Sequence, residues 1–252
     1  MQPLSDKGSG CTEGCTMQTL WLLLIEQGWG AAILRGSLVT IVVGLLGMLI
    51  GLVFAIPFAL ARWTKIAALS QAIHGYTLIV RSIPGLLVIY LLFFGSVESV
   101  EAIATFFGFE EAAKSAYPFI MGTASIAIIS CAYSVEVLRG ALQAIPTGLL
   151  EASKALSLPR GIVYLKIIAP LMFRYALPGL NNVWQSTIKD TSLISVVGLQ
   201  EVMRLSSIAA GTTRSPLFFY MIAGCVFLAI TGVSQISFTY LESRVGRGFK
   251  VS

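Results

Sequence analysis

The stretch SLVTIVVGLLGMLIGLVFAIPFALA, residues 37–61, decides the fold class. It contains no charged side chain, and Arg62 and Lys65 follow it directly. Roughly 20 consecutive apolar residues span the ~30 Å hydrocarbon core of a bilayer, where only helices and closed barrels pair every backbone group. Because the apolar residues do not alternate with polar ones, the stretch predicts a transmembrane helix rather than a barrel strand. Gly47 and Gly51, four residues apart within it, would let a second helix approach closely.

The composition of the whole chain agrees with a membrane protein. Of its 252 residues, 56% are hydrophobic and 12% are charged, whereas about 25% of the residues in a soluble domain are charged. The mean hydropathy is +0.84. The sequence therefore predicts an all-α membrane protein surrounded by a lipid bilayer. We interpret the net charge of +5 as a matter of membrane topology, not as a nucleic-acid-binding surface.

Three further segments are apolar enough to predict membrane spans: Ile83–Gly95, Pro118–Val137 and Leu217–Ser237. Before the first of these, Ile66–Val80 repeats apolar residues at helical spacing and predicts an amphipathic helix at the membrane interface. Residues 98–114 hold four glutamates and one lysine, and they predict an acidic loop.

The basic residues predict the topology, because Lys and Arg concentrate in the cytoplasmic loops of membrane proteins. Segments 62–65, 139–174 and 244–250 hold two, five and three of the chain's 17 Lys and Arg residues. If all three are cytoplasmic, an even number of spans must separate each from the next. The acidic loop is then outside, and a fourth span must lie at Leu177–Leu199, which is too polar to be evident from hydropathy. The prediction is five transmembrane helices, with the N-terminus periplasmic and the C-terminus cytoplasmic.

This topology divides the chain into three parts. Residues 1–30 are predicted to form a periplasmic tail, in which the short apolar run Leu20–Ile25 lies on the membrane surface. We see no cleavable signal peptide there. Cys11 and Cys15 could form a local disulfide if this tail meets an oxidising compartment. Residues 31–245 form the transmembrane domain with the cytoplasmic loop 139–174, and residues 246–252 form a cytoplasmic tail.

The deduced fourth span carries an unusual number of polar side chains. Four of them recur at the spacing of one helical face: Asn181, Gln185, Lys189 and Ser192. Polar groups are expensive against lipid, so this face predicts a wet cavity or a partner chain. For Asn181 and Gln185, lining a substrate pathway and hydrogen bonding to another helix are about equally favoured. For Lys189, a structural ion pair with another span is at least as favoured as contact with substrate.

The cytoplasmic loop 139–174 is long for a simple connection. Pro146 and Gly148 before it, and Pro159 after it, bracket a stretch of about two helical turns that starts near Glu151. Physical reasoning alone leaves two interpretations open. The stretch is either a helix that docks into a groove of a soluble protein or an ordinary solvated helix.

The loop resembles a known motif. Permeases of the ATP-binding-cassette (ABC) importers carry Glu-Ala-Ala, three residues, Gly, nine residues, and then Ile-x-Leu-Pro. This chain has Glu151-Ala152-Ser153, three residues, Ser157, nine residues, and then Ile167-Ile168-Ala169-Pro170. The spacing is kept, whereas Ser153, Ser157 and Ala169 depart from the motif. Ser157 stands where the family has a glycine that eases a tight turn.

Further motifs are similar to those of the polar amino-acid subgroup of these permeases. They lie in order at residues 81–84 (RSIP), 132–140 (AYSVEVLRG), 145–148 (IPTG), 174–185 (RYALPGLNNVWQ) and 189–193 (KDTSL). The motif at residues 174–185 looks especially like that of permeases for basic amino acids and opines. The resemblance covers roughly residues 33–245, and it is specific because several motifs agree in order and spacing.

The resemblance implies a type I ABC importer permease in the bacterial inner membrane, working with several partners. These would be a second permease chain (identical or paralogous), two ATPase subunits and a periplasmic substrate-binding protein. The coupling residues would be Glu151, Ala152, Ser153, Ala155, Leu156, Ser157 and Pro170. The chain has no Gly-x-x-x-x-Gly-Lys-[Ser/Thr] phosphate loop. We therefore predict no catalytic residue, cofactor or metal in this chain, and ATP and Mg in the partner ATPase.

Several residues admit a plainer interpretation. Glu136 is a candidate for the substrate pathway, but pairing with Arg139 at i, i+3 is favoured. Arg81 is expected to extend to the cytoplasmic interface, and His74 to be a surface residue without ligand partners. The rival functions are a gradient-driven transporter or channel, for which we find no internal repeat, and a membrane enzyme, for which we find no catalytic constellation.

Overall fold

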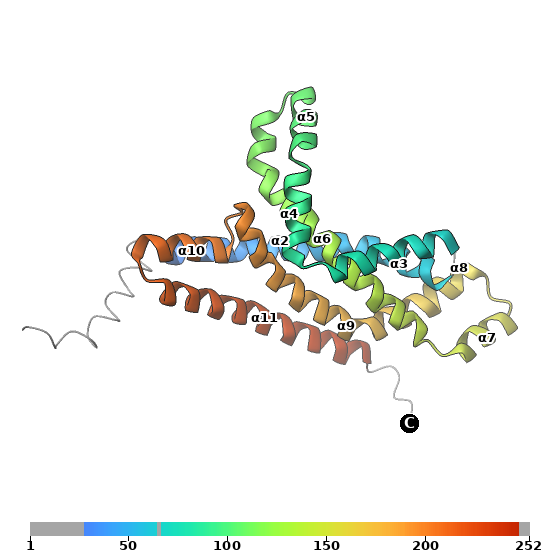
Figure 1. The fold of residues 1–252 in the computed structure, drawn as a ribbon. Helices are drawn as coiled ribbons and strands as arrows, with labels where there is room; N and C mark the ends of the chain where they lie inside the picture. Colours follow the sequence, from blue (N-terminus) through green and yellow to red (C-terminus); the bar gives the residue numbers. More distant parts are fainter. Residues whose placement is uncertain (1–27, 65–66, 247–252) are drawn as a thin grey trace, which may run out of the picture.

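A computed structural model describes residues 28–64 and 67–246 (Figure 1). Every regular element among these residues is helical. Five of the described helices are long and apolar enough to cross a membrane: Trp29–Trp63, Gly85–Phe107, Glu110–Gln143, Arg160–Val197 and Pro216–Val245. The predicted count of five spans is confirmed, including the fourth span that hydropathy ranks poorly. The predictions for Leu20–Ile25 and for Cys11 and Cys15 concern segments outside the described residues.

Two long helices, α2 (Trp29–Trp63) and α6 (Glu110–Gln143), pack against each other at the centre of the molecule. Glycines let them approach. A Cβ atom at Gly51 would lie 2.3 Å from the Oγ atom of Ser130 and 2.8 Å from the carbonyl oxygen of Ala127. Ser130 in turn donates a hydrogen bond of 3.1 Å to the carbonyl oxygen of Gly47. The close packing predicted from the two glycines is therefore found, with α6 as the neighbour.

The second span differs from the prediction. α3 (Ala67–Ser82) ends at the Ser82-Ile83-Pro84 break, after which α4 (Gly85–Gly95) and α5 (Val97–Phe107) continue as helices. The prediction of a loop at 98–114 is wrong, because α5 turns at Gly108, whose φ is 73°, directly into the first turn of α6. In Figure 1, α4, α5 and the beginning of α6 stand out from the rest of the molecule. We call residues 85–121 the arm.

The segment predicted to be a cytoplasmic loop, residues 139–174, is largely helical, so the connection between spans is shorter than predicted. It contains α7 (Thr147–Ala155), and a continuous helical run then starts at α8 (Arg160–Ile162). This run passes through a π-helical turn, η2 (Val163–Ile168), into α9 (Ala169–Asp190) and ends in a 3₁₀ segment, η3 (Thr191–Val197). The predicted fourth span, Leu177–Leu199, is therefore only the second half of a longer helix.

A further helix that was not predicted, α10 (Val202–Thr213), lies between the fourth and fifth spans. It packs against α2 and against α11 (Pro216–Gly246). In Figure 1, α10 lies at the end of the molecule opposite α7 and α8. The main buried core lies between α2, α6 and α9, and it includes Ala55, Ala59, Val135, Leu138, Met172, Ala176 and Ile188.

Candidate functional site

The short helix α7 has a buried face and an exposed face. Ile145, just before it, is buried, and Leu150 packs against the main core. Ser153 also lies inward, where its hydroxyl donates a hydrogen bond of 2.7 Å to the carbonyl oxygen of Leu150. The opposite face is exposed: Glu151, Ala152, Lys154 and Ala155, followed by Leu156, which is 71% exposed. Of the predicted coupling residues on α7, Ser153 therefore lies on the buried face, and the others lie on the exposed face.

The end of α7 is a tight turn at Ser157. Its φ is 50°, in the left-handed region that glycine adopts most easily. The amide of Ser157 donates to the carbonyl oxygen of Lys154 (2.9 Å), and the amide of Leu158 donates to that of Ser153 (3.1 Å). These two bonds form a Schellman motif. The turn that the glycine of the family motif would make is thus also made here by serine. Pro170 lies apart from α7, exposed as the second residue of α9.

The predicted polar face of α9 is divided between two environments. Asn181 is buried and donates a hydrogen bond of 3.1 Å to Oε1 of Gln235 on α11. Gln185 donates to the same oxygen and to the carbonyl oxygen of Thr231, each at 3.4 Å. These two amides join α9 to α11. Of the two interpretations given above, the structure therefore shows hydrogen bonding to another helix. Sequence reasoning missed Gln235, although it is the one amide side chain within α11.

A different set of polar residues is exposed on α9. Asn182, Ser186 and Lys189 are all exposed and follow one another at steps of four and three residues, so they share one helical face. Ser192 donates a hydrogen bond of 2.6 Å to the carbonyl oxygen of Lys189. Within the part of the chain that the structure describes, neither Lys189 nor Asp190 forms an ion pair. The structural ion pair, one of the two interpretations of Lys189, is therefore not found among the described residues.

A cluster of charged groups joins α2, α3 and α6. Arg62, at the end of α2, pairs with Oε1 of Glu136 on α6. The other oxygen of Glu136 accepts from Nε and Nη2 of Arg139 at 3.0 and 2.9 Å. Two residues of α3 complete the cluster: the Thr77 hydroxyl donates to Glu136 (3.1 Å), and His74 accepts from Arg62 (3.1 Å). The predicted Glu136–Arg139 pair is found. His74 is exposed, as predicted.

A cavity of about 380 Å³ lies beside this cluster. Arg62, Arg139 and Glu136 line it together with Arg81 and Tyr133. The Arg81 guanidinium lies over the Tyr133 ring, 5.4 Å from its centroid, a cation–π contact. The cavity thus brings together three guanidinium groups and one carboxylate. Such a site suits a ligand that carries a carboxylate.

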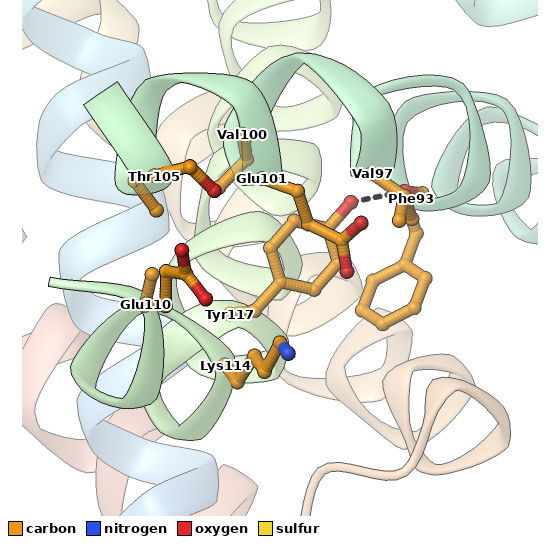
Figure 2. Close-up of a pocket in the computed structure, with 10 residues that line it drawn as sticks. Phe93, Val97, Val100, Glu101, Thr105, Glu110, Lys114 and Tyr117 are labelled. Atoms are coloured by element: carbon orange, nitrogen blue, oxygen red, sulfur yellow. Dashed lines mark hydrogen bonds between the residues drawn. The ribbon is translucent and has the colours of Figure 1, made fainter. Parts of the chain in front are cut away.

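A second cavity of about 380 Å³ lies in the arm, between α5 and the beginning of α6 (Figure 2). Its charged lining residues are Glu101, Glu110 and Lys114, and all three are exposed. Tyr117 also lines it and donates a hydrogen bond to the carbonyl oxygen of Phe93. This is the segment predicted to be acidic and outside. The charges of the described chain are therefore mainly acidic on the arm and mainly basic around α7.

One further carboxyl group, Glu201, is buried where α10 begins. Its side chain is 1% exposed. It accepts hydrogen bonds from the amides of Met203 (2.9 Å) and Arg204 (2.8 Å), the N-terminal cap of α10, and a long bond of 3.5 Å from Thr40 on α2. Burial raises the pKa of Glu201 to about 7, although these hydrogen bonds act to lower it. Sequence reasoning overlooked this residue because it lies outside every predicted span.

Comparisons with known proteins agree with this arrangement. Residues 47–247 match the family model described as "Binding-protein-dependent transport system inner membrane component". The octopine transport system permease protein of Agrobacterium tumefaciens (strain Ach5) is 41% identical over 224 residues, covering 89% of this chain and 94% of the relative. The nopaline transport system permease protein of Agrobacterium fabrum is 38% identical, covering 89% and 95%. The histidine/lysine/arginine/ornithine permease protein of Escherichia coli K12 is 31% identical, covering 88% and 97%.

Solved structures show the same fold. An amino acid ABC transporter with histidines superposes with a TM-score of 0.74 at 22% identity, covering 88% of this chain and 98% of that one. The MetNI methionine ABC transporter in an inward-facing conformation gives a TM-score of 0.69 at 15% identity, covering 91% and 99%. The five membrane-capable helices of the described chain, its type I permease fold and its relatives lead to one conclusion. The chain belongs to the family of binding-protein-dependent transport system inner membrane components, as the inner-membrane permease subunit of an ABC importer.

Proposed function

We propose that this chain forms half of the translocation pathway of an ATP-driven importer for amino acids or opines, with a preference for basic ones. The relatives at 41% and 38% identity transport octopine and nopaline by their names, and the more distant one transports histidine, lysine, arginine and ornithine. The higher identity to the opine permeases favours an opine-like substrate. Two separate ATPase subunits hydrolyse ATP with Mg, and a periplasmic binding protein delivers the substrate.

The observation that carries this proposal is the two-sided packing of α7. Its inner face is fixed by Ile145, Leu150 and Ser153, while Glu151 and Leu156 are free to contact another protein. A helix held in this way transmits force in both directions between its partner and the spans. We assign the outer face of α7, with Glu151, Ala152, Ala155, Leu156 and the turn at Ser157, to the ATPase contact. Pro170 starts the helix that returns from this contact into the membrane.

We assign the α7 end of the molecule to the cytoplasm and the acidic end of the arm, residues 98–114, to the periplasm. Arg139, Lys154, Arg160 and Lys166 surround α7, whereas the arm carries four glutamates and one lysine. Lys and Arg mark the cytoplasmic side of membrane proteins. The N-terminus is then periplasmic and the C-terminus cytoplasmic.

We assign the substrate pathway to two places. Asn182, Ser186 and Lys189 lie on the exposed face of α9. Because polar groups are costly against lipid, this face meets a second permease chain across a wet pathway. Closer to the cytoplasm, the cavity beside Arg81 and Glu136 receives the carboxylate of the substrate. Of the residues predicted for the pathway, Lys189, Ser192 and Glu136 keep this assignment, whereas Asn181 and Gln185 support the helix that carries it.

The Glu151→Arg variant tests the proposal. It places a cation on the exposed face of α7 without touching the buried face. We expect normal membrane insertion and loss of the ATPase subunits from the purified complex. The matched control is Glu98→Arg, the same change of charge on the exposed surface of the arm, which should keep the ATPase subunits bound. Normal ATPase association in Glu151→Arg would refute the coupling role of α7.

A further inference from the structure

Two arginine residues of the charged cluster line two cavities at once. Arg62 and Arg139 face the cavity of about 380 Å³ that also contains Arg81 and Tyr133. The same two residues also line another cavity, of about 420 Å³, whose lining includes Thr147 and Leu150 of α7. The charged cluster is therefore the partition between the proposed substrate cavity and the proposed coupling helix.

This partition is made of ion pairs, not of apolar packing. The Glu136 side chain is 17% exposed, and those of Arg62 and Arg139 are 11% and 32% exposed. Glu136 uses both carboxylate oxygens, one toward Arg62 and Thr77 and the other toward Arg139. It thereby ties the end of α2 and the middle of α3 to α6. Only three residues then separate the end of α6, at Gln143, from the start of α7, at Thr147.

The charges in the cluster do not balance. Two guanidinium groups share a single carboxylate, so the cluster carries one excess positive charge in a partly buried place. An uncompensated charge in such surroundings is unfavourable, and an arriving carboxylate is attracted to it with paired hydrogen bonds available. The approach from the Arg81 side is lined by a third guanidinium, that of Arg81. A substrate carboxylate in this cavity would compete with Glu136 for Arg62 and Arg139.

We propose that this competition is how occupancy of the substrate cavity reaches α7, with Glu136 as the positioning residue that holds the empty state. In the empty state, Glu136 binds both arginines and locks α2 and α3 to α6. When a substrate carboxylate binds the arginines, the grip of Glu136 on them loosens and α6 is released together with α7. The inference rests on the proposed function, because it requires a carboxylate-bearing substrate and an ATPase whose activity depends on the position of α7.

The test is the Glu136→Gln variant in the complete importer, reconstituted with its ATPase subunits and binding protein. The measured quantity is the ratio of ATPase rates with and without binding protein saturated with arginine, and separately with octopine. Allosteric couplings of this kind are typically about fivefold or larger, so wild type should show at least about that ratio with one of the two. The amide cannot hold two guanidinium groups as an anion does. We therefore expect the unstimulated rate of Glu136→Gln to rise and its ratio to fall to about one.

Two controls separate a coupling role from a structural one. Glu98→Gln, the same substitution on the exposed surface of the arm, should keep the wild-type ratio. Glu136→Asp keeps the charge but shortens its reach, and it should give a ratio between those of wild type and Glu136→Gln. If the Glu136→Gln complex fails to assemble, the ratio measured for Glu136→Asp tests the inference in its place.

A Glu136→Gln or Glu136→Asp complex that is less heat-stable but keeps the wild-type ratio would overturn the inference, because Glu136 would then be only a structural group. A wild-type complex whose ATPase does not respond to either loaded binding protein would overturn the proposed function itself, and the inference with it.

Discussion

Glu136 and Glu201 both carry carboxyl groups that are largely removed from solvent, yet their partners are of opposite kinds, charged for one and neutral for the other. Glu136 lies near Arg62, at one end of α2, between two guanidinium groups. Glu201 contacts Thr40, about 33 Å away along α2 at 1.5 Å per residue. Among the described residues it has no cationic partner, only backbone amides and one hydroxyl.

The difference separates two uses of a buried carboxyl group. With two arginines beside it, Glu136 joins helices that come from three separate parts of the chain, and its bonds can be exchanged for those of another anion. Glu201 stabilises the start of a single helix and holds it against α2. We therefore expect the α7 end to respond to ligands and charge, and the α10 end to respond to pH.

The largest contrast should come from truncating each residue to alanine. Glu136→Ala leaves two partly buried arginines without their shared carboxylate, which costs about 3–5 kcal/mol of folding free energy. Glu201→Ala removes a helix cap, which costs about 1–2 kcal/mol. Thermal unfolding of the purified permease in one detergent measures both. A larger loss for Glu201→Ala would show that the ion cluster contributes less than the cap.

The pH dependence is the next largest effect. The folded protein raises the pKa of Glu201 from 4.5 to about 7, so between these values the folded state binds more protons than the unfolded state. The stability that Glu201 contributes is therefore complete below about pH 4.5 and is lost as the pH rises through about 7, by on the order of 2–3 kcal/mol. We expect the unfolding temperature of wild type to fall between pH 5 and pH 8. Glu201→Gln, which cannot ionise, should remove most of that slope. An equal slope in wild type and variant would assign the dependence to other groups.

The smallest contrast concerns the two threonines that contact these carboxyl groups. The Thr77 hydroxyl donates to Glu136 at 3.1 Å, whereas the Thr40 bond to Glu201 is 3.5 Å long. A normal hydrogen bond contributes about 1 kcal/mol net, and a long one contributes less. The Thr77 hydroxyl also lies within 3.0 Å of the carbonyl oxygen of His74, and the Thr40 hydroxyl also accepts a long bond of 3.4 Å from the amide of Val202. Because both bonds of Thr40 are long, Thr77→Val should destabilise the protein by about 1 kcal/mol and Thr40→Val by less. The same unfolding measurement ranks the two losses of stability. Equal losses would mean that the length of the hydrogen bond does not set its contribution.

The sequence predicted the parts of the fold that depend on composition and on small residues. The continuous apolar runs and the distribution of Lys and Arg were sufficient to predict five spans, because both patterns follow directly from the cost of polar groups in lipid. Gly51 was sufficient to predict that another helix packs closely on α2, although only the structure identifies Ser130 and Ala127 as its neighbours. The resemblance implied a tight turn where Ser157 replaces the glycine of the family motif, but only the structure shows that serine makes this turn, at φ 50°.

The site was predicted less well, for a geometric reason. Adjacent residues on a helix point about 100° apart, so Asn181 and Asn182 face different neighbours, and the sequence does not say which of them faces α11. The cluster around Glu136 combines Arg62, Thr77 and Arg139, whose contacts depend on how three helices pack. The acidic segment was predicted to be a loop because charge was taken as a sign of irregular structure. Instead, Gly108 allows two helices to meet there.

The proposed topology places α7 in the cytoplasm, where an ATPase can reach it, and residues 98–114 of the arm on the opposite side of the membrane. Two single cysteines test it directly, Leu156→Cys on α7 and Glu98→Cys on the arm, in a variant whose native Cys11, Cys15, Cys131 and Cys225 are replaced by serine. Both positions are exposed. In intact cells that lack the ATPase subunits and whose outer membrane has been made permeable, a membrane-impermeant maleimide should label the cysteine at 98 and leave that at 156 unlabelled. Inverted vesicles from the same cells should show the reverse. Labelling at 156 from outside intact cells would contradict the account.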